Sequence, residues 1–509
     1  VSTYAFYSKE MTERNRERDP LLLSTTIDKT EEEAFVKSAP RSRRPGPISK
    51  RTIIVEPTIF LYFLASTPTV TLTEQFVYHM VGKEYHGDDD ATHEETQCSA
   101  ANESASEAEL RATIQAQASR WMLYLNASIL VPQFFMVLIL GAYSDIGGRK
   151  CVILISIAGT CLHCISNVII MYLDLGIEYL IIGCVLEGLS GGGSALTSAS
   201  FAYIADITVL DDRSFRMTAL NAVLGISGAA AQLGIGYWIN IAGYLPPFWF
   251  VSGVHIVNIF YVILFVPELN QQKNKNGNFN PCRDIKNATS LYYKTDTSGR
   301  NWKLLVLLIS FALVAMLANG RDDVLTLFML NRPLCWNSIF IGYFTATWTL
   351  LMNLGGMVGV KLFDRCFTDG GMIMIASVLG TATQVIQAFA RNIIMMFIGP
   401  VLGMFASMFL PLIRAIMSKT VMDDEQGALF AGIGCVETAC VLGGSSFFNM
   451  IYAVTVHWFG GFVFLVMGGI SLLSMVTFGI YMKMSGMHLL VFKQREKIRS
   501  TLSSDESKV

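Results

Sequence analysis

The ten residues Gly141–Lys150, "GAYSDIGGRK", place an aspartate, an arginine and a lysine between two strongly apolar runs. The first run ends near Tyr143 and the second begins at Cys151. A charged cluster between two runs that avoid water is expected where a chain leaves one membrane-crossing helix and enters the next. This stretch therefore predicts a short loop at a membrane surface.

The composition places the chain among membrane proteins. Of its 509 residues, 52% are hydrophobic and only 15% are charged, with a mean hydropathy of +0.45, whereas charged residues make up about 25% of an ordinary soluble domain. Apolar runs of about 20 residues, each long enough to cross a hydrocarbon layer of roughly 30 Å, recur along nearly the whole sequence. We predict an all-α membrane protein with twelve transmembrane helices. They are centred on Ile53–Val77, Trp121–Tyr143, Cys151–Leu173, Tyr179–Ala205, Thr218–Ala242, Phe248–Val266, Trp302–Leu330, Ile339–Leu362, Met372–Ala390, Ile393–Ile416, Ala428–Val454 and Phe459–Met482.

The positions of Lys and Arg predict the orientation of the chain, because these residues favour the cytosolic ends of membrane helices. Loops 174–178, 243–247 and 457–459 contain neither residue. Both termini are therefore expected in the cytosol, and twelve crossings agree with that parity. The net charge of −2 favours no particular partner, and we expect no nucleic acid. The basic residues that define the cytosolic side are Arg41, Arg43, Arg44, Lys50, Arg51, Arg149, Lys150, Arg213, Arg216, Lys273, Lys275, Arg283, Lys286, Lys493, Arg495, Lys497 and Arg499.

Two terminal segments, 1–51 and 484–509, are predicted to be disordered cytosolic tails because they are rich in charge and serine and poor in aromatic residues. The first contains "ERDPLLL", in which Glu17 precedes Leu21 and Leu22 with the spacing of an endosomal and lysosomal sorting signal. If sorting adaptors bind this motif, the protein is delivered to endosomal or lysosomal membranes. If the pattern arose by chance, the plasma membrane is the expected location.

The segment 82–117 is predicted to be a long, acidic outer loop. It carries the sequon Asn102-Glu103-Ser104, which can be glycosylated only on the luminal or outer side. Cys98 in this loop and Cys335 are the two of the ten cysteines placed on the oxidising side, and we expect them to form a disulfide. The alternative is two free thiols.

The segment 267–301 is predicted to be a cytosolic linker between two halves of six helices each, 52–266 and 302–483. Two equal halves indicate a transporter built from two repeats, with its site at their interface near mid-membrane.

The opening stretch has the pattern G-x-x-x-D-x-x-G-R-[RK], and it resembles the loop between the second and third helices of the major facilitator superfamily. The resemblance implies that Asp145 and Arg149 form a charge latch on neighbouring helix ends, and that Gly141 and Gly148 let the backbone turn tightly. A weaker copy, "GVKLFDR", places Asp364 and Arg365 at the equivalent loop of the second half. The alternative is a basic surface loop with a turn.

Several longer motifs resemble solute carrier family 46, which contains the proton-coupled folate transporter and its lysosomal and thymic relatives. The resemblance extends from about Val55 to Met482. The motifs are "VEPTIFL" (Val55–Leu61), "FAYIADIT" (Phe201–Thr208), "RSFRM" (Arg213–Met217), "RPLCWNSIFIGY" (Arg332–Tyr343) and "EQGALFAGIGCVET" (Glu425–Thr438).

This resemblance implies roles for Asp206, Asp323 and Arg414, each of which stands in a matching motif, and it implies the disulfide between Cys98 and Cys335. Two positions depart from the folate-transporting member: Asn221 stands where that protein has a proton-coupling glutamate, and Ala318 stands where it has a histidine. Folate is therefore not assigned as the substrate.

Ionisable groups inside hydrocarbon cost at least ~2.5–3.5 kcal/mol each at the centre, so they mark a cavity or an ion path. Glu187 lies roughly 14 Å from the outer end of its helix at about 1.5 Å per residue, before the small-residue cluster "GLSGGGS". Glu437 lies at a comparable depth. Either glutamate can carry a coupled proton, and the alternative is a neutral acid hydrogen-bonded between helices.

Arginines near the centre of the protein are candidates for anion binding. Arg321, Asp322 and Asp323 cluster in the outer part of their helix, and Arg414 lies toward the inner part of another. A guanidinium that faces a cavity attracts anions and can bind a carboxylate through two hydrogen bonds. The alternative role for Arg414 is to pair with a neighbouring acid.

Two apparent motifs carry no function in this interpretation, and a third motif is absent. The G-x-S-x-G at Gly188–Gly192 has no preceding strand, as a nucleophile elbow requires. The run Cys161-Leu162-His163-Cys164 has metal-like spacing but no second pair of ligands, so we assign it to core packing. No phosphate-binding G-x-x-x-x-G-K-[ST] loop occurs, so we expect neither ATP-driven pumping nor any cofactor or metal.

The sequence thus predicts a secondary active transporter, not an enzyme, that moves a small organic anion with protons by alternating access. Its expected partners are the organic substrate, protons and the lipid bilayer. The alternative is a membrane receptor or scaffold that has kept the fold and lost transport. An intramembrane enzyme would need a catalytic pair or metal cluster at one depth, and the sequence offers none.

Overall fold

The computed structural model describes residues 54–86, 105–210, 212–269, 300–330, 334, 336, 338–422 and 425–490. All of them belong to one compact unit, Ser49–Val509. Their regular structure is helical, and one isolated bridge pairs Phe367 with Leu490. Most helices are apolar on all sides, as membrane-crossing helices are.

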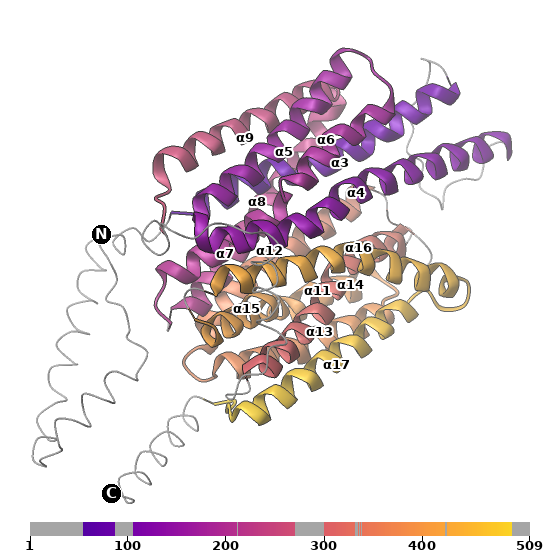
Figure 1. The fold of residues 1–509 in the computed structure, drawn as a ribbon. Helices are drawn as coiled ribbons and strands as arrows, with labels where there is room; N and C mark the ends of the chain where they lie inside the picture. Colours follow the sequence, from indigo (N-terminus) through magenta and orange to yellow (C-terminus); the bar gives the residue numbers. More distant parts are fainter. Residues whose placement is uncertain are drawn as a thin grey trace, which may run out of the picture. The chain divides into compact units, whose positions relative to one another are not determined.

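The first half consists of six long helices, one of them interrupted (Figure 1). Their bounds are α3 (Glu56–His86), α4 (Ala105–Gly147), α5 (Arg149–Tyr172), a 3-10 turn (Ile177–Tyr179) followed by α6 (Leu180–Leu189) and α7 (Gly192–Ile207), α8 (Arg213–Ala242) and α9 (Leu245–Phe265).

The second half has the same order of elements, again with its fourth helix interrupted. Its bounds are α11 (Arg300–Leu330), α12 (Ser338–Phe363), α13 (Asp369–Ala388), α14 (Ile393–Gly403), a 3-10 turn (Ala406–Met408), α15 (Phe409–Thr420), α16 (Gln426–Phe459) and α17 (Phe462–Ser485).

The helices of the two halves pack in the same pattern. In the first half α3 contacts α8 and α9, α5 contacts α9, and α4 contacts α6; in the second, α11 contacts α16 and α17, α13 contacts α17, and α12 contacts α14. The halves meet through α4 against α16, seen side by side in Figure 1, and through the equivalent pair α12 against α8. The structure is therefore an internal repeat with a symmetric interface.

Within the described residues, nine helical segments are long and apolar enough to cross a membrane. Helices α3, α8 and α12 have 31, 30 and 26 residues but lack the same apolar character. These three pack in series, α3 on α8 and α8 on α12, so much of their surface faces other helices rather than lipid. The count of twelve spans stays a prediction.

Several predicted boundaries differ from the structure. Helix α3 continues to His86 and α4 begins at Ala105, so both described ends of the expected outer loop 82–117 are helical. At the other terminus, α17 runs to Ser485, and Leu489 O accepts a hydrogen bond from Thr368 N at 3.0 Å. The expected tail 484–509 therefore begins as packed chain, because the carbonyls of 488 and 489 bond to the amino end of α13.

The fourth helix is interrupted where the sequence predicted one continuous span. Gly191 and Gly192 adopt φ of 78° and 46°, a left-handed conformation that glycine tolerates and other residues rarely adopt. The equivalent helix of the second half breaks between Gly403 and Phe409. The small residues that the sequence marked as a possible bend therefore form a true break between α6 and α7.

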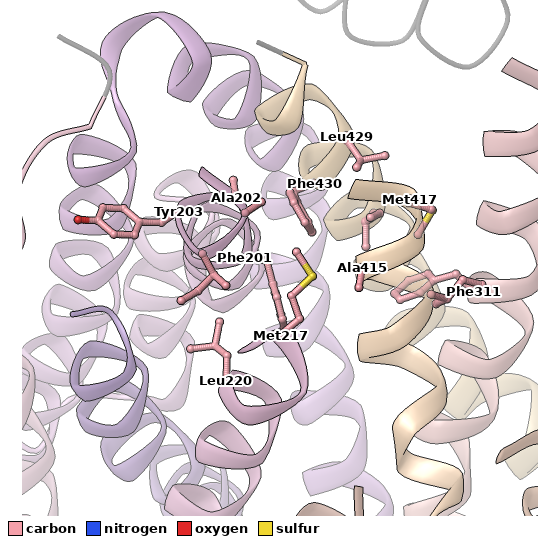
Figure 2. Packing of buried hydrophobic residues seen from close by; sticks show 14 of the residues in the cluster. Phe201, Ala202, Tyr203, Met217, Leu220, Phe311, Ala415, Met417, Leu429 and Phe430 are labelled. Atoms are coloured by element: carbon pink, nitrogen blue, oxygen red, sulfur yellow. The ribbon is translucent and has the colours of Figure 1, made fainter. Parts of the chain in front are cut away.

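The largest buried apolar cluster extends across both halves. Phe201 of α7 stacks on Phe430 of α16, with ring centroids 6.1 Å apart and planes 15° apart. Figure 2 shows the side chains around this pair, among them Met217 of α8 and Phe311 of α11. Apolar packing joins the two halves on the side that the sequence predicts to be cytosolic.

Gly141 lies at the closest approach of α4 and α16, where a Cβ would stand 2.1 Å from Ala431 Cβ. We expect Gly141→Ala to lower the free energy of unfolding by about 1–3 kcal/mol, the usual cost of overpacking. The measurement is the thermal unfolding midpoint of the purified protein in detergent. Gly253→Ala is the matched control, because a Cβ there meets nothing within 4 Å. Equal midpoints for the two variants would contradict the close approach.

Candidate functional site

Arg149 occupies the centre of a charge cluster at the predicted cytosolic end. Its Nη2 lies 2.8 Å from Asp145 Oδ1, its Nε donates to Asp206 Oδ2 at 3.1 Å, and its Nη1 donates to Ser144 Oγ. The side chain is 0% exposed. Because the cation lies between two carboxylates, it fixes the end of α4, the start of α5 and the end of α7 together.

Asp145 also binds the second half. Its two carboxylate oxygens accept hydrogen bonds from Gly427 N at 2.8 Å and Ala428 N at 2.9 Å, in the first turn of α16. A carboxylate at a helix amino end accepts hydrogen bonds from backbone N–H groups that have no partner within the helix. Its negative charge also interacts favourably with the positive end of the helix dipole. Gly427 leaves room for it, because a Cβ there would lie 2.3 Å from Arg149 Nη1. The latch residues named from the sequence thus lie together and reach across the interface.

The two latch glycines have different roles, and one differs from the prediction. Gly148 adopts φ of 101° and permits the turn between α4 and α5. Gly141 lies inside α4, where its lack of a side chain permits the approach of α16 rather than a turn.

The second-half copy of the latch uses a different acid from the one predicted. Asp364 and Arg365 are exposed, and neither side chain has a hydrogen bond or ion pair with another described residue. Asp369, at the start of α13, instead accepts from Lys419 Nζ at 2.6 Å and from Ser214 Oγ of the first half at 2.8 Å. The sequence spacing favoured Asp364, but helix α12 ends at Phe363 and leaves that carboxylate facing away from the interface.

A further contact between the halves joins Arg213 to α15. Its Nη1 donates to Ser418 O at 3.0 Å and to Ser418 Oγ at 3.1 Å, while its Nη2 donates to Ala205 O at 2.8 Å. Sequence analysis counted Arg213 only as a basic residue of the cytosolic side. With the latch and Asp369, this arginine closes the predicted cytosolic end.

Arg414 and Glu437 form an ion pair deeper in the protein. Arg414 Nη2 lies 2.7 Å from both carboxylate oxygens of Glu437. The guanidinium also lies over two aromatic rings, with Cζ 4.6 Å from the centroid of Phe201 and 5.0 Å from that of Phe311. Because Phe201 belongs to the first half and the ion pair to the second, this arginine is located at the interface between the halves.

The pair is asymmetric in its exposure. The side chain of Arg414 is 4% exposed and that of Glu437 is 29% exposed. A ligand or proton can therefore reach the carboxylate while the guanidinium is held by aromatic rings. Sequence analysis named both residues but did not place them in contact, since they are 23 positions apart on different helices.

Glu187 lies elsewhere, inside the first half. Its Oε2 is 2.5 Å from His163 Nδ1, and its Oε1 accepts from Thr160 Oγ1 at 3.2 Å. Sequence analysis assigned His163 to core packing and missed this pairing. The sequence feature that could have indicated this pair is a histidine in an otherwise apolar helix, 24 positions before a buried glutamate.

Other candidate residues have simpler surroundings. Arg321 pairs with the neighbouring Asp322 at 2.7 Å and lies 4.1 Å over the ring of Trp348. Asn221 is half-buried on α8. Asp323 lies on α11, but its side chain is outside the described set. The remaining sites also lie outside the described residues: Cys98, Cys335, Asn102, Glu17, Leu21 and Leu22.

The comparisons with known proteins agree with this architecture. Residues 58–365 match the model of the Major Facilitator Superfamily. The proton-coupled folate transporter of rat is 31% identical over 433 residues, which are 85% of this chain and 92% of the relative. The chain belongs to the major facilitator superfamily, in solute carrier family 46.

A second relative is the lysosomal proton-coupled steroid conjugate and bile acid symporter SLC46A3 of chicken. It is 29% identical over 432 residues, which cover 84% of this chain and 93% of the relative. The protein is accordingly a multi-pass membrane protein and a secondary active transporter, not an enzyme.

Solved structures share the fold at low sequence identity. The human organic anion transporter MFSD10 superposes with a TM-score of 0.65 at 15% identity, over 85% of this chain and all of that one. The fucose:proton symporter of E. coli superposes with a TM-score of 0.58 at 10% identity, over 84% of this chain and 97% of that one.

We expect Asp145→Asn to weaken the contact between the halves. The amide has only one oxygen to accept from the α16 backbone, and it lacks the negative charge that pairs with Arg149. The expected loss is about 1–3 kcal/mol of unfolding free energy, read as a lower thermal midpoint in detergent. Asp364→Asn removes the same charge from an exposed position and should leave the midpoint unchanged. A midpoint for Asp145→Asn equal to that of Asp364→Asn would refute the assignment.

Proposed function

We propose that this transporter moves a small organic anion together with protons by alternating access, with the Arg414–Glu437 pair as the anion and proton site. The observation that carries the proposal is a buried arginine paired with a more exposed glutamate at the interface of the halves. The relatives named for proton-coupled transport of folate, steroid conjugates and bile acids support an anionic substrate.

Charge balance explains why proton and anion should move together. In the empty site the Arg414 cation and the Glu437 anion cancel. When a proton neutralises Glu437, Arg414 is free to bind the carboxylate or sulfate of a substrate, and the loaded site is again neutral. A site that held only the proton or only the anion would carry a net charge through the membrane, which costs at least ~2.5–3.5 kcal/mol near the centre.

The latch supplies the conformational part of the proposal. Asp145, Arg213 and Asp369 hold the predicted cytosolic end closed, so the present arrangement is not open toward the cytosol. Substrate release into the cytosol requires these contacts to separate. Weakening them should change turnover more than substrate affinity, because they lie away from Arg414.

The experiment is an uptake panel in cells that express the full chain, at acidic and neutral outside pH. Labelled folate, a sulfated steroid and a bile acid serve as probes, with a neutral steroid as the negative control. We expect at least one anion to accumulate several-fold more at acidic pH, in line with an added proton driving force. No uptake of any anion at either pH, with the protein present at the membrane, would favour the receptor or scaffold alternative.

Arginine variants test the site within the same assay. Arg414→Gln should abolish uptake of the transported anion, and Arg414→Lys should retain only part of it, because an ammonium cannot form the planar paired contact. Arg321→Gln is the matched control in another helix, where the arginine pairs with its neighbour Asp322. Retained uptake in Arg414→Gln would remove this residue from the site.

We propose further that both termini are cytosolic, that Cys98 and Cys335 form a disulfide, that Asn102 is glycosylated, and that adaptors bind the Glu17-to-Leu22 motif. The last proposal predicts that Leu21→Ala combined with Leu22→Ala moves the protein from endolysosomal membranes to the cell surface. Surface biotinylation against the unmodified chain measures the shift. An unchanged surface fraction would mean that this motif is not a sorting signal.

A further inference from the structure

A cluster of hydrogen-bonded, titratable side chains lies inside the first half, separate from Arg414. Glu187 of α6 contacts His163 Nδ1 of α5 at 2.5 Å, and Thr160 Oγ1 links the other carboxylate oxygen to Tyr62 OH of α3 through contacts of 3.2 and 2.9 Å. The second ring nitrogen of His163, Nε2, faces Asn167 Nδ2 at 3.2 Å. Tyr62, Thr160, His163 and Asn167 are each at most 5% exposed.

Other titratable groups surround the pair. Cys184 Sγ of α6 lies 3.8 Å from His163 Nε2, and Cys164 lies on α5 against Thr69. From α9, His255 packs its ring 5.4 Å from that of Tyr62 and is 0% exposed. Neither ring nitrogen of His255 has a hydrogen-bond partner among the described residues. The adjacent helix α4 presents the neutral amide of Gln133 near Gly192.

Asn167 is suited to two protonation states of His163. An amide nitrogen can donate to an unprotonated Nε2, whereas an amide oxygen can accept from a protonated one. Asn167 Oδ1 is buried and has no partner in the described part of the chain. Rotation of the amide by half a turn therefore exchanges one hydrogen bond for the other without moving the backbone.

The cluster is directly connected to the break in the fourth helix. Glu187 lies in the last turn of α6, and its backbone oxygen accepts hydrogen bonds from Ser190 N at 3.1 Å and Ser190 Oγ at 2.7 Å. Gly191 and Gly192 follow in left-handed conformation. Movement of the Glu187 side chain is therefore transmitted to the point where α6 bends into α7.

The same break is joined to the second half. Ser194, in the first turn of α7, accepts from Gln133 Nε2 at 2.5 Å and from Thr438 Oγ1 of α16 at 3.0 Å. Thr438 directly follows Glu437, the acid that pairs with Arg414. The path from His163 thus runs through Glu187 to Ser190, whose Oγ accepts from Gly192 N at 3.4 Å, then along the backbone to Ser194, and across the Thr438 hydrogen bond toward the anion site.

We propose that the Glu187–His163–Asn167 cluster is a second proton-binding site, inside the first half, and that its protonation sets the bend that holds Ser194 against Thr438. This inference rests on the proposed transport function for its transport readout. In the unloaded state Glu187 is a carboxylate and His163 is neutral. One proton adds to Nε2, a new N–H bond forms, and the Asn167 amide rotates so that its oxygen accepts that bond.

The charge of the cluster changes from one negative charge to zero in this step. The loaded cluster is a neutral ion pair and fits a closed, dry environment, whereas the unloaded carboxylate favours access to water. The proton therefore stabilises the packed arrangement of α5, α6 and α7. Release of the proton loosens it.

The binding of the proton is tested without any substrate. The full chain is labelled with nitrogen-15 histidine and reconstituted in lipid bilayers, and solid-state nuclear magnetic resonance follows its seven histidines as pH is lowered. We expect one signal, absent in His163→Gln, to change from the unprotonated to the protonated ring. A His163 signal that keeps one form over the whole range would overturn the proposal.

The coupling is tested by uptake into proteoliposomes of whichever anion the panel identifies. With one proton at Glu437 and a second at His163, uptake by the unmodified protein should rise by up to about 100-fold per pH unit of acidification, whereas His163→Gln and Glu187→Gln should keep only the Glu437 proton and rise by no more than about tenfold. Exchange of labelled for unlabelled anion, which needs no net proton movement, should survive. Glu178→Gln removes an exposed acid ahead of the same helix and is the control.

Asn167→Asp separates a loss of proton coupling from a loss of folded protein, because it is expected to shift the pH profile of uptake and not to abolish uptake. An ionised aspartate only accepts hydrogen bonds and so favours protonated His163. It should shift the pH of half-maximal uptake toward neutral values. A full, unshifted pH profile in all three variants would overturn the proposal. Absence of any anion uptake by the unmodified protein would instead defeat the proposed function, and the histidine signals alone would then decide this inference.

The relay to the second half has its own variant. Thr438→Val removes the hydroxyl that donates to Ser194 while keeping nearly the same volume. The His163 signal should still titrate, but uptake should lose the same part of its pH dependence that His163→Gln removes. If uptake keeps the pH dependence of the unmodified protein, the contact with Ser194 does not carry the coupling.

Discussion

The buried guanidinium of Arg149 joins the ends of α4, α5 and α7, and the contact between the two halves depends on this junction. It lies between the carboxylates of Asp145 and Asp206, and the amino end of α16 adds partial positive charge beside Asp145. Removing the cation would leave two buried carboxylates without a counter-charge, a loss of ~3–5 kcal/mol in comparable buried pairs. Gly427 is required because a side chain there would collide with Arg149 and Asp145, whereas Gly148 is required for its φ of 101°. The ion pairs and hydrogen bonds at the carboxyl end of α4 therefore hold the two halves together at the predicted cytosolic side.

The repeat explains why the interface is formed twice. Helix α4 packs on α16 as α8 packs on α12, and the fourth helix of each half is interrupted. An interrupted helix leaves backbone groups unsatisfied inside the membrane, which is tolerated only where protein or a polar cavity receives them. In the first half Ser190 bonds the carbonyl of Glu187 at the break, and in the second Ser407 bonds the carbonyls of Met352 and Met404. Each break thus lies beside an ionisable residue, Glu187 in one half and Arg414 in the other.

Pairing of charges lets these residues remain in hydrocarbon and also makes them responsive. Arg414 with Glu437, and His163 with Glu187, are each stable as neutral combinations. A proton changes the partner that each residue prefers without leaving an isolated charge. Because Ser194 and Thr438 connect the neighbourhoods of the two pairs, a change in one can alter packing at the other. Phe201 of α7 stacks on Phe430 of α16, so the same two helices that Ser194 and Thr438 join are also held by apolar packing.

Periodicity and composition were enough to determine an all-α membrane protein of two equal halves. The length of each apolar run is a property of consecutive residues, so it can be read without knowing the tertiary structure. The loop stretch Gly141–Lys150 resembles a known family motif, and that resemblance named Asp145 and Arg149 together; the structure places the two side chains 2.8 Å apart. The tertiary structure decided what depends on distant partners. It paired Arg414 with Glu437, gave Asp369 the role expected of Asp364, and turned His163 from an apparent packing residue into the partner of Glu187. Such pairings join residues on separate helices, and the hydrophobic pattern that places a helix in the membrane does not fix which polar side chains of its neighbours it will meet.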